Sequence, residues 1–323
     1  MEEKDLKAAA DLIRSGQSFL IACHVRPDGD TLGCALALAG ALRRTGKQVE
    51  IVSPDGVPAT YRFLPGANSI IAATDKRGFH AAIAPDCDGL ERVGDALEAV
   101  QSARRILSID HHSSKAPFGD VQLYDATAAA TAEIVVELFD RMGTPIDEET
   151  AVCLMTGLVS DTGAFRFQNV TPKTFLAAAR LASAGASPHE IARLVYESRS
   201  AESTRLLGVA LAGLKTDETH RIVWAVLTRE DFERTGATDG DTEGIVNHLQ
   251  AVKNAGVALL FRETPDSEAQ VSLRSREIDV SKIAQVFGGG GHPAASGCTV
   301  RAPAHEAEQR VIEETRRWTA SST

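Results

Sequence analysis

The stretch SFLIACHVRPDGD, residues 18–30, joins an apolar run to a group of polar side chains. Its first six residues predict a short buried strand, because an apolar run of this length is typical of the inside of a sheet. His24, Asp28 and Asp30 then lie in the segment that leaves the strand. Pro-Asp-Gly-Asp is also ordinary turn chemistry, so this stretch alone does not separate a functional loop from a solvated turn.

Further β-rich runs predict the class of the first half of the chain. They cover 48–53, 81–85 and 104–109, and the small-residue-rich segment 32–45 predicts a helix between the first two strands. Strands that alternate with helices predict an α/β domain, with a mostly parallel sheet flanked by helices. More helices are predicted at 128–142 and 148–159, from Pro172 up to Gly185, and from SPHE at 187–190 onward.

After about residue 205 the pattern changes to that of a smaller α+β domain. The domain prediction is therefore a first domain at 1–186, a helical linker at 187–208 and a second domain at 209–323. Strands of the second domain are predicted at 221–228, 257–263, 269–275 and 296–301, and helices at 241–254, 279–287 and 304–318.

Composition and charge restrict the classes of function. The formal net charge of -10 argues against a general basic face, which proteins that bind long duplex nucleic acid usually have. The chain opens on a polar segment rather than a signal peptide and contains no apolar run of about 20 residues, which argues against a membrane protein. Five dispersed cysteines without a CxxC pair are typical of reduced thiols, so a cytoplasmic location is expected.

Three more polar clusters follow predicted elements of the first half. APDCDG at 84–89 and SIDHHSS at 108–114 follow strands, and VSDTGAF at 159–165 ends a helical run. Functional groups of open α/β sheets gather outside the carboxyl ends of the strands, so these side chains are expected at one edge. The candidates are His24, Asp28, Asp30, Asp86 or Asp88, Asp110, His111, His112 and Asp161.

This set of side chains favours a metal site. Several carboxylates in one place repel each other unless cations neutralise them. Oxygen ligands mixed with imidazole suit Mn²⁺, Fe²⁺ or Zn²⁺ better than Ca²⁺. Two such ions about 3.5–4 Å apart form the clamp that is used for in-line attack on phosphate esters.

The order of these motifs resembles the DHH phosphoesterase superfamily. HxxPDGD is followed by an Asp-Cys pair with Arg92 five residues later, then DHH, DTG and GGGGH, and the second half is similar to the DHH-associated C-terminal domain. Within the superfamily the chain most resembles the short nanoRNases. The resemblance implies a phosphodiesterase and exoribonuclease that degrades very short RNA oligonucleotides and removes the 3′-phosphate of 3′-phosphoadenosine 5′-phosphate.

The resemblance also implies roles for the candidate residues, with two divalent ions, Mn²⁺ above all, as cofactors. His24 and Asp28 would hold the first ion, and Asp30, His111 and Asp161 the second, with Asp86 rather than Asp88 bridging both. His112 would face the substrate phosphate, and Asp110 would orient His111 or His112 through a hydrogen bond. The segment TAAATAE, 127–133, lacks a serine that relatives often carry, and Glu133 within it is expected to be structural.

The segment FGGGGHPAASG, 287–297, predicts a loop whose glycines expose backbone N–H groups to an anion or a base. Gly290, Gly291 and His292 are its predicted substrate contacts. Arg274 and Ser275, in SLRS, resemble terminal-phosphate contacts of the family, and a surface salt bridge is the other interpretation of Arg274. Arg166, in GAFRF, is a further predicted contact.

Other functions remain open on the sequence. The same fold serves phosphodiesterases of cyclic or linear dinucleotide messengers, and a nucleotide sensor with an inactive metal site is a third candidate. Intact ligand residues argue against the sensor. The expected partners are short single-stranded RNA or DNA oligonucleotides, dinucleotides or nucleotide bisphosphates. Relatives are often dimers, which makes a homodimer an open expectation that the residues do not decide.

Overall fold

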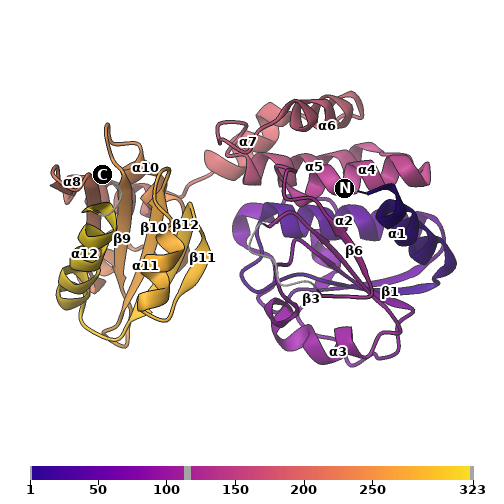
Figure 1. Ribbon diagram of the computed structural model, residues 1–323, viewed down its shortest axis with the longest axis horizontal. Helices are drawn as coiled ribbons and strands as arrows, with labels where there is room; N and C mark the ends of the chain where they lie inside the picture. The colour runs from indigo at the N-terminus through magenta and orange to yellow at the C-terminus, as the bar shows by residue number, and fades with distance from the viewer. Residues whose placement is uncertain (1, 113–117, 321–323) are drawn as a thin grey trace. The chain divides into compact units, whose positions relative to one another are not determined.

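The structure is a computed structural model that describes residues 2–112 and 118–320 (Figure 1). It divides into two compact units, Met1–Ser198 and Arg199–Thr323. The predicted linker, 187–208, contains α7 (Pro188–Tyr196) and the first part of α8 (Ala201–Ala212). Within the described residues, no helix has the length and apolar character that crossing a membrane requires.

The first unit is built on a six-stranded sheet in which every neighbouring pair is parallel. The strand order is β3-β2-β1-β4-β5-β6, so the direction in which successive strands are added to the sheet reverses between β1 and β4. This confirms the predicted mostly parallel sheet. The strands are β1 (Ser18–Ala22), β2 (Gln48–Val52), β3 (Ile70–Ile71), β4 (Ala81–Pro85), β5 (Ile106–Asp110) and β6 (Val121–Tyr124).

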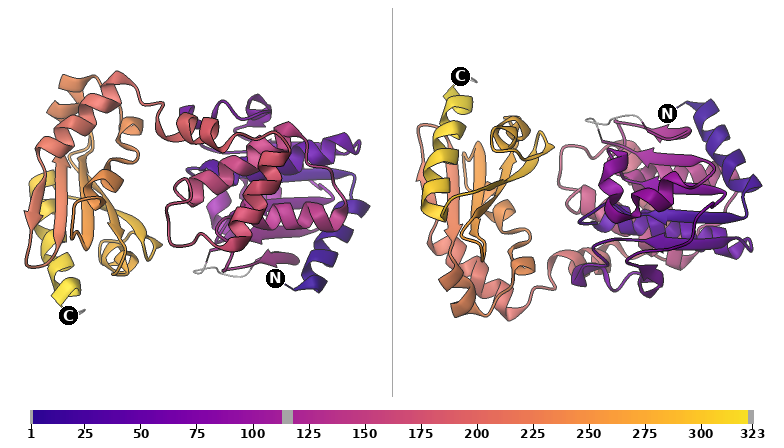
Figure 2. Two further views of the ribbon diagram at one scale, coloured as in Figure 1. Left: turned by 90° about the horizontal axis from the view of Figure 1, so that it is seen from above. Right: turned by 90° about the horizontal axis from the view of Figure 1, so that it is seen from below.

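Helices cover both faces of this sheet (Figures 1 and 2). Successive residues of β1 alternate between two apolar clusters: Phe19 and Ile21 pack with the larger helices, and Leu20 and Ala22 pack toward α3. A strand buried on both faces needs the unbroken apolar run of the sequence. The helices are α1 (Glu3–Ser15), α2 (Gly29–Arg44), α3 (Leu97–Gln101), α4 (Thr131–Met142), α5 (Glu148–Asp161), α6 (Pro172–Ser183) and α7, with 3₁₀ turns at Ala59–Tyr61, Ala67–Ser69 and Leu90–Ala96.

The second unit is a mixed six-stranded sheet in the order β11-β12-β10-β9-β8-β7. Only β8 and β9 pair in parallel. Two apolar clusters cover its faces, one with α11 and α12 and the other with α8, α9 and α10. The elements are β7 (Lys215–Asp217), β8 (Ile222–Leu227), α9 (Arg229–Thr235), α10 (Ile245–Gln250), β9 (Val257–Glu263), β10 (Ala269–Ser275), α11 (Val280–Val286), β11 (Gly290–His292), β12 (Ala295–Val300) and α12 (Ala304–Ala320).

Two predicted elements of the second unit differ from the structure. The helix predicted at 241–254 is divided into a 3₁₀ turn, Asp239–Thr242, and the short α10. Gly244 separates them with a φ of +75°, which an α-helix cannot contain. The predicted open loop of glycines includes β11, an edge strand that pairs antiparallel with β12.

Candidate metal centre

The predicted polar residues of the first unit converge at the carboxyl ends of its central strands. His24 follows β1, Asp86 follows β4, and Asp110 ends β5. The reversal of strand order lies between β1 and β4, which is the place where ligands bind in open α/β sheets. Asp28 and Asp30 come from the start of α2, and Asp161 comes from the end of α5.

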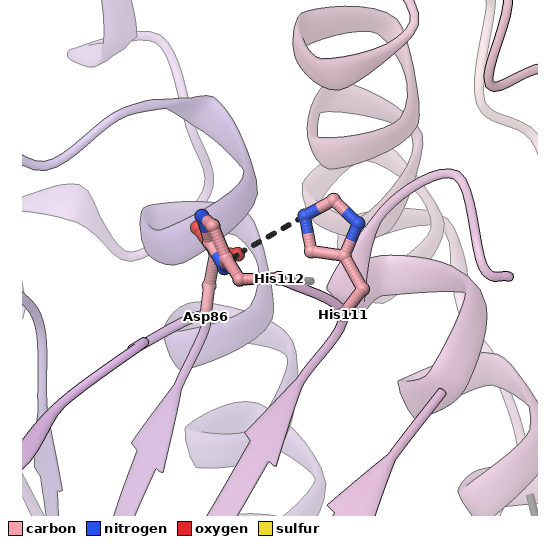
Figure 3. Close-up of side chains that lie close together, drawn as sticks. All are labelled: Asp86, His111 and His112. Carbon is pink, nitrogen blue, oxygen red and sulfur yellow. Dashed lines mark ion pairs between the residues drawn. The ribbon is translucent and has the colours of Figure 1, made fainter. Parts of the chain in front are cut away.

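Asp86 lies at the centre of the cluster. One group of potential ligand atoms comes from His24, Asp28 and Asp86, and these atoms all lie within 4.8 Å of one another. A second group, under the same limit, comes from Asp30, Asp86, His111 and Asp161, and a third comes from Asp86, His111 and His112. His111 Nε2 lies 3.6 Å from Asp86 Oδ1 (Figure 3).

Asp88, the alternative to Asp86, belongs to none of these groups in the described part of the chain. Its Oδ1 lies 3.9 Å from Arg92 Nε, and its side chain is partly exposed. The geometry therefore favours Asp86 as the residue shared between two ions.

Backbone carbonyls orient two of the imidazoles. The Nδ1 atoms of His24 and His111 lie 2.8 Å from Val25 O and 3.2 Å from Ala128 O. An Nδ1–H that donates to a carbonyl leaves Nε2 as the unprotonated, ligating nitrogen, which is how proteins usually fix histidines at metals. Each of these Nε2 atoms lies 3.6 Å from an oxygen of Asp86.

His112 has a different anchor. Its Nδ1 lies 2.6 Å from Asp110 Oδ1, which also accepts a hydrogen bond from the His112 backbone. Of the two histidines that Asp110 was predicted to orient, the structure therefore pairs it with His112. Although burial opposes the charged imidazole, the Asp110 and Asp86 carboxylates raise the pKa of His112.

Two threonines that the sequence analysis did not single out hold Asp86 in place. Thr31 Oγ1 donates to Asp86 Oδ2 at 2.8 Å, and Thr131 Oγ1 donates to Oδ1 at 3.0 Å. Thr131 belongs to the segment where a serine was expected, so a hydroxyl is present in that segment after all. Asp86 itself has a φ of +57°, a conformation rare for residues other than glycine. Such strained positions are concentrated at functional sites.

Asp28 and Asp30 are each tied to the beginning of a helix. Asp28 caps α2 through its Oδ1, which accepts from the backbone N–H groups of Asp30 and Thr31. The two oxygens of Asp30 accept from Thr131 N at 2.6 Å and Ala132 N at 2.9 Å, at the start of α4. The unpaired N–H groups of helix starts are favourable partners for carboxylates.

Glycines allow α2 and α5 to approach closely enough to bring Asp30 and Asp161 together. A Cβ on Gly33 would overlap the carbonyl oxygen of Cys153, and a Cβ on Gly157 would overlap Asp30 Oδ1. Both glycines lie within one turn of a predicted ligand, Gly33 after Asp30 and Gly157 before Asp161. This spacing is the signal in the sequence that the motif analysis did not use.

The cluster gathers the carboxylates of Asp28, Asp30, Asp86, Asp110 and Asp161 around three imidazoles, and this excess of acidic groups fits a site for divalent cations. Burial, with the Asp28 and Asp86 carboxylates, raises the pKa of Asp161 to about 6, and burial raises the pKa of Asp30 well above its usual range. Despite burial, Asp86 raises the pKa of His24 to about 9. Among the described residues, Asp110 Oδ2 is buried without a hydrogen-bond partner, and His111 Nε2 lies 3.0 Å from Asp161 Oδ2. Mixed oxygen and imidazole donors of this kind suit Mn²⁺, Fe²⁺ or Zn²⁺.

The remaining predicted contacts lie mainly in the second unit. Arg274, on β10, is half-buried and donates from Nη1 to Leu273 O at 2.9 Å. No carboxylate of the described residues lies within 4.0 Å of it, so the structure does not contain the alternative surface salt bridge. Ser275 is only 1% exposed, donates to Gly256 O and accepts from the N–H groups of Glu277 and Ile278. These three hydrogen bonds hold the Ser275 hydroxyl within this turn.

Backbone geometry explains three of the four glycines before His292. Gly288 ends α11 with a φ of +72°, and a Cβ on Gly289 would overlap Gly297 O. Gly291 has a φ of +135°, and a Cβ there would lie 2.7 Å from Ala295 O. Gly290 has open space where a Cβ would be and no positive φ, so the fold does not require a glycine there. His292 is half-buried, and its carbonyl oxygen accepts from Ser296 Oγ.

Arg166 and Glu133 complete the predicted set, in the first unit. Arg166 is exposed, donates from Nε to Gly163 O at 2.6 Å, and places its guanidinium 5.7 Å from the Tyr196 ring centroid. Glu133 Oε2 accepts from Thr174 Oγ1 at 3.0 Å and from Ala129 N at 3.4 Å. These contacts give Glu133 the structural surroundings that were expected.

Comparisons with known proteins agree with this geometry. The model of the DHH family, N-terminal domain, matches residues 18–158, and that of the DHHA1 domain matches residues 219–321. The bifunctional oligoribonuclease and PAP phosphatase NrnA of Thermus thermophilus is 31% identical over 317 residues, 96% of this chain and 93% of that protein. The protein of the same name from Bacillus subtilis is 27% identical over 86% of this chain and 87% of its own.

A solved structure has the same fold over nearly the whole length. An exopolyphosphatase-related protein from Bacteroides fragilis matches with a TM-score of 0.94 and 26% sequence identity. The match covers 99% of this chain and 97% of that one. The two-unit architecture is therefore shared with a protein of known structure.

Proposed function

Because the chain belongs to the DHH family and is a hydrolase of phosphoester bonds, we propose that it acts on short RNA oligonucleotides. Dinucleotides and slightly longer chains are the proposed substrates, and mononucleotides are the products. The second proposed substrate is 3′-phosphoadenosine 5′-phosphate, which would yield AMP. The names of the Thermus and Bacillus relatives support both substrates.

The metal site that we propose contains two divalent ions, with Mn²⁺ as the preferred metal. His24, Asp28 and Asp86 would hold the first ion, and Asp30, Asp86, His111 and Asp161 the second. The observation that carries the proposal is the membership of Asp86 in both ligand groups. A carboxylate with two oxygens can bind one ion through each, which keeps the two ions close together.

Divalent ions held by these residues would lower the pKa of an attacking water and neutralise charge on the phosphate. His112 donates a hydrogen bond from Nε2 to the phosphate or to the leaving oxygen. Asp110 holds the His112 ring through Nδ1. Thr31 and Thr131 hold the Asp86 carboxylate through one hydrogen bond to each oxygen, the orientation in which it would serve both ions.

We assign the second domain, 209–323, to substrate binding and the first, 1–186, to catalysis. Arg274 is the proposed contact for a terminal phosphate, because it is a half-buried cation for which the described residues provide no carboxylate. Gly290, Gly291 and His292, at the edge of the sheet, are proposed to lie against the substrate. Ser275 is not among the proposed substrate contacts, because its hydroxyl is buried and hydrogen-bonded within the unit.

The experiment that tests the function compares four substrates with Mn²⁺ present. They are a 5′-phosphorylated RNA dinucleotide, a 20-mer RNA, 3′-phosphoadenosine 5′-phosphate and cyclic di-AMP. The proposal expects the dinucleotide and the bisphosphate to be hydrolysed in preference to the other two. Preference for cyclic di-AMP would instead assign the site to dinucleotide messengers, and no hydrolysis at all would favour the nucleotide sensor.

A further inference from the structure

The segment that follows Asp161 has a strained backbone. Gly163, Ala164 and Phe165 have φ values of +56°, +57° and +63°, and two of the three are not glycine. Residues with side chains rarely adopt this conformation, and it persists only where surrounding contacts enforce it. The enforcing contacts come from Thr162, whose carbonyl accepts from Arg166 N at 2.9 Å and Phe167 N at 3.0 Å. Its hydroxyl also accepts from Phe165 N at 3.0 Å.

Asn169 ties this segment to the second ligand group. Its Nδ2 lies 3.0 Å from Asp161 O and 2.9 Å from Ala129 O. Asp161 is a proposed ligand, and Ala129 lies two residues before the N–H group of Thr131 that binds Asp30. The segment is therefore fixed to both elements that carry the second ligand group.

The side chain of Phe167, in this segment, is exposed on one side and held by a contact on the other. Half of its surface is exposed, and among the described residues it belongs to none of the apolar core clusters. Its ring lies directly against Gly163, where a Cβ would overlap it. Single exposed apolar residues are common on protein surfaces. This ring differs in its place, because it is held on a strained segment directly after the proposed ligand Asp161, where an exposed aromatic face suits binding.

Arg166, the residue before Phe167, brings a cation to the same segment. Arg166 is exposed, and within the described residues no carboxylate lies in ion-pair range of it. An exposed aromatic ring and an arginine in one segment are the two kinds of side chain with which proteins bind single-stranded nucleotides, the ring for the base and the cation for the backbone.

We propose that Phe167 is a stacking platform for the nucleobase of the nucleotide that carries the scissile phosphate. The inference rests on the proposed function, since it assigns one more residue to the same substrate. The ring lies four residues from Gly163 in sequence but directly against it in space, and Gly163 is only two residues from Asp161. Two residues of chain span at most about 7 Å, so a base on this ring is within reach of a nucleotide whose phosphate lies at Asp161. Because every base has an aromatic face, stacking fits an enzyme that accepts different sequences.

The test measures kcat/KM on two substrates that differ only in their bases. One is a 5′-phosphorylated diadenosine dinucleotide, and the other is the same molecule with an abasic sugar in place of each nucleoside. The variants are Phe167→Leu, which removes the ring but keeps an apolar side chain, and Phe167→Trp, which keeps an aromatic surface. Leu176→Ala is the matched control, because Leu176 is 71% exposed on the neighbouring helix α6.

For Phe167→Leu we expect kcat/KM on the dinucleotide to fall by about 5- to 150-fold, the range that one stacked base contributes. On the abasic substrate the variant should match the wild type, and Phe167→Trp and Leu176→Ala should be close to wild type on both. A loss of the same size on both substrates would overturn the inference, because it would show a structural role. No loss on either would overturn it as well.

The same measurement separates this inference from the proposed function. If the wild-type enzyme hydrolyses neither the dinucleotide nor its abasic analogue, the proposed function fails and the inference fails with it. If the wild type hydrolyses the dinucleotide and Phe167→Leu changes kcat/KM on both substrates by the same factor, or on neither, only the inference fails.

Discussion

Replacing Gly157 with alanine should inactivate the enzyme while leaving it largely folded. The added Cβ would overlap Asp30 Oδ1 and would lie 2.9 Å from the Cβ of Ala132. Asp30 must then shift, together with its hydrogen bonds to the start of α4. A displacement of about 1 Å of a positioned group can lower the rate about 100-fold. We therefore expect kcat/KM to fall by about two orders of magnitude and Mn²⁺ to bind more weakly at the second ligand group.

The expected effect of Gly157→Ala on stability is small because two terms oppose each other. Overpacking a buried position costs about 1–3 kcal/mol. Alanine is about 1 kcal/mol more favourable than glycine inside a helix. The free energy of unfolding should therefore decrease by no more than about 2 kcal/mol, which urea unfolding followed by circular dichroism can measure.

Gly40→Ala is the matched control for this experiment. Gly40 lies inside α2, and a Cβ there would meet only the end of the Arg44 side chain, at 3.3 Å. The variant should be about 1 kcal/mol more stable than wild type and fully active. Wild-type activity and Mn²⁺ affinity in a folded Gly157→Ala variant would refute the reasoning, because the close approach of α5 to Asp30 would then have no part in the site.

Three further predictions address the site and the substrate. Asp86→Asn should abolish hydrolysis and retain the fold, because asparagine tolerates a φ of +57° and can still form hydrogen bonds with both threonines. Asp88→Asn is the control and should remain active. Activity assays measure the hydrolysis, and circular dichroism checks the fold. Arg274→Ala should raise KM for a 5′-phosphorylated dinucleotide about tenfold more than for a chromogenic phosphodiester that lacks a terminal phosphate, and equal increases would contradict the phosphate contact. Removal of divalent ions with EDTA should lower the melting temperature, and Mn²⁺ at about 100 times its Kd should restore about 2.7 kcal/mol of stability. A melting temperature that does not change with Mn²⁺ would count against a resident metal.

The convergence of the polar motifs was predictable because it follows from sheet topology. Residues that follow parallel strands meet at one edge of the sheet, whatever their separation in sequence. His24 and Asp86 are 62 residues apart, yet the strands β1 and β4 that precede them are neighbours. The local apolar runs were enough to predict these strands, and the motifs were enough to predict the cluster.

What the sequence analysis missed depends on contacts that no local pattern contains. Thr31 and Thr131 both reach Asp86, but only the fold brings the starts of α2 and α4 to the same carboxylate. The helix α1 was missed because its polar composition hid a buried stripe, which consists of Leu6, Ala9, Ala10 and Ile13 at helical spacing. The glycines of β11 were interpreted as a loop, since a glycine-rich strand has no side-chain pattern to reveal it.

The geometry of the metal cluster also explains why its carboxylates lie at a strained backbone position or at helix starts rather than within regular strands. If β4 continued straight past Asp86, the Asp86 side chain would lie on one face of the sheet, away from the ligands at the helix starts. The positive φ of Asp86 ends β4 and turns the carboxylate toward the start of α4, where Thr131 meets it. Asp28 and Asp30 reach the cluster through the first turns of helices. Both N–H groups at the start of α2 bind Asp28 Oδ1, which leaves Oδ2, and the two N–H groups at the start of α4 bind one oxygen of Asp30 each. The ligands are thus fixed by backbone groups, and acceptor positions on their oxygens remain for cations.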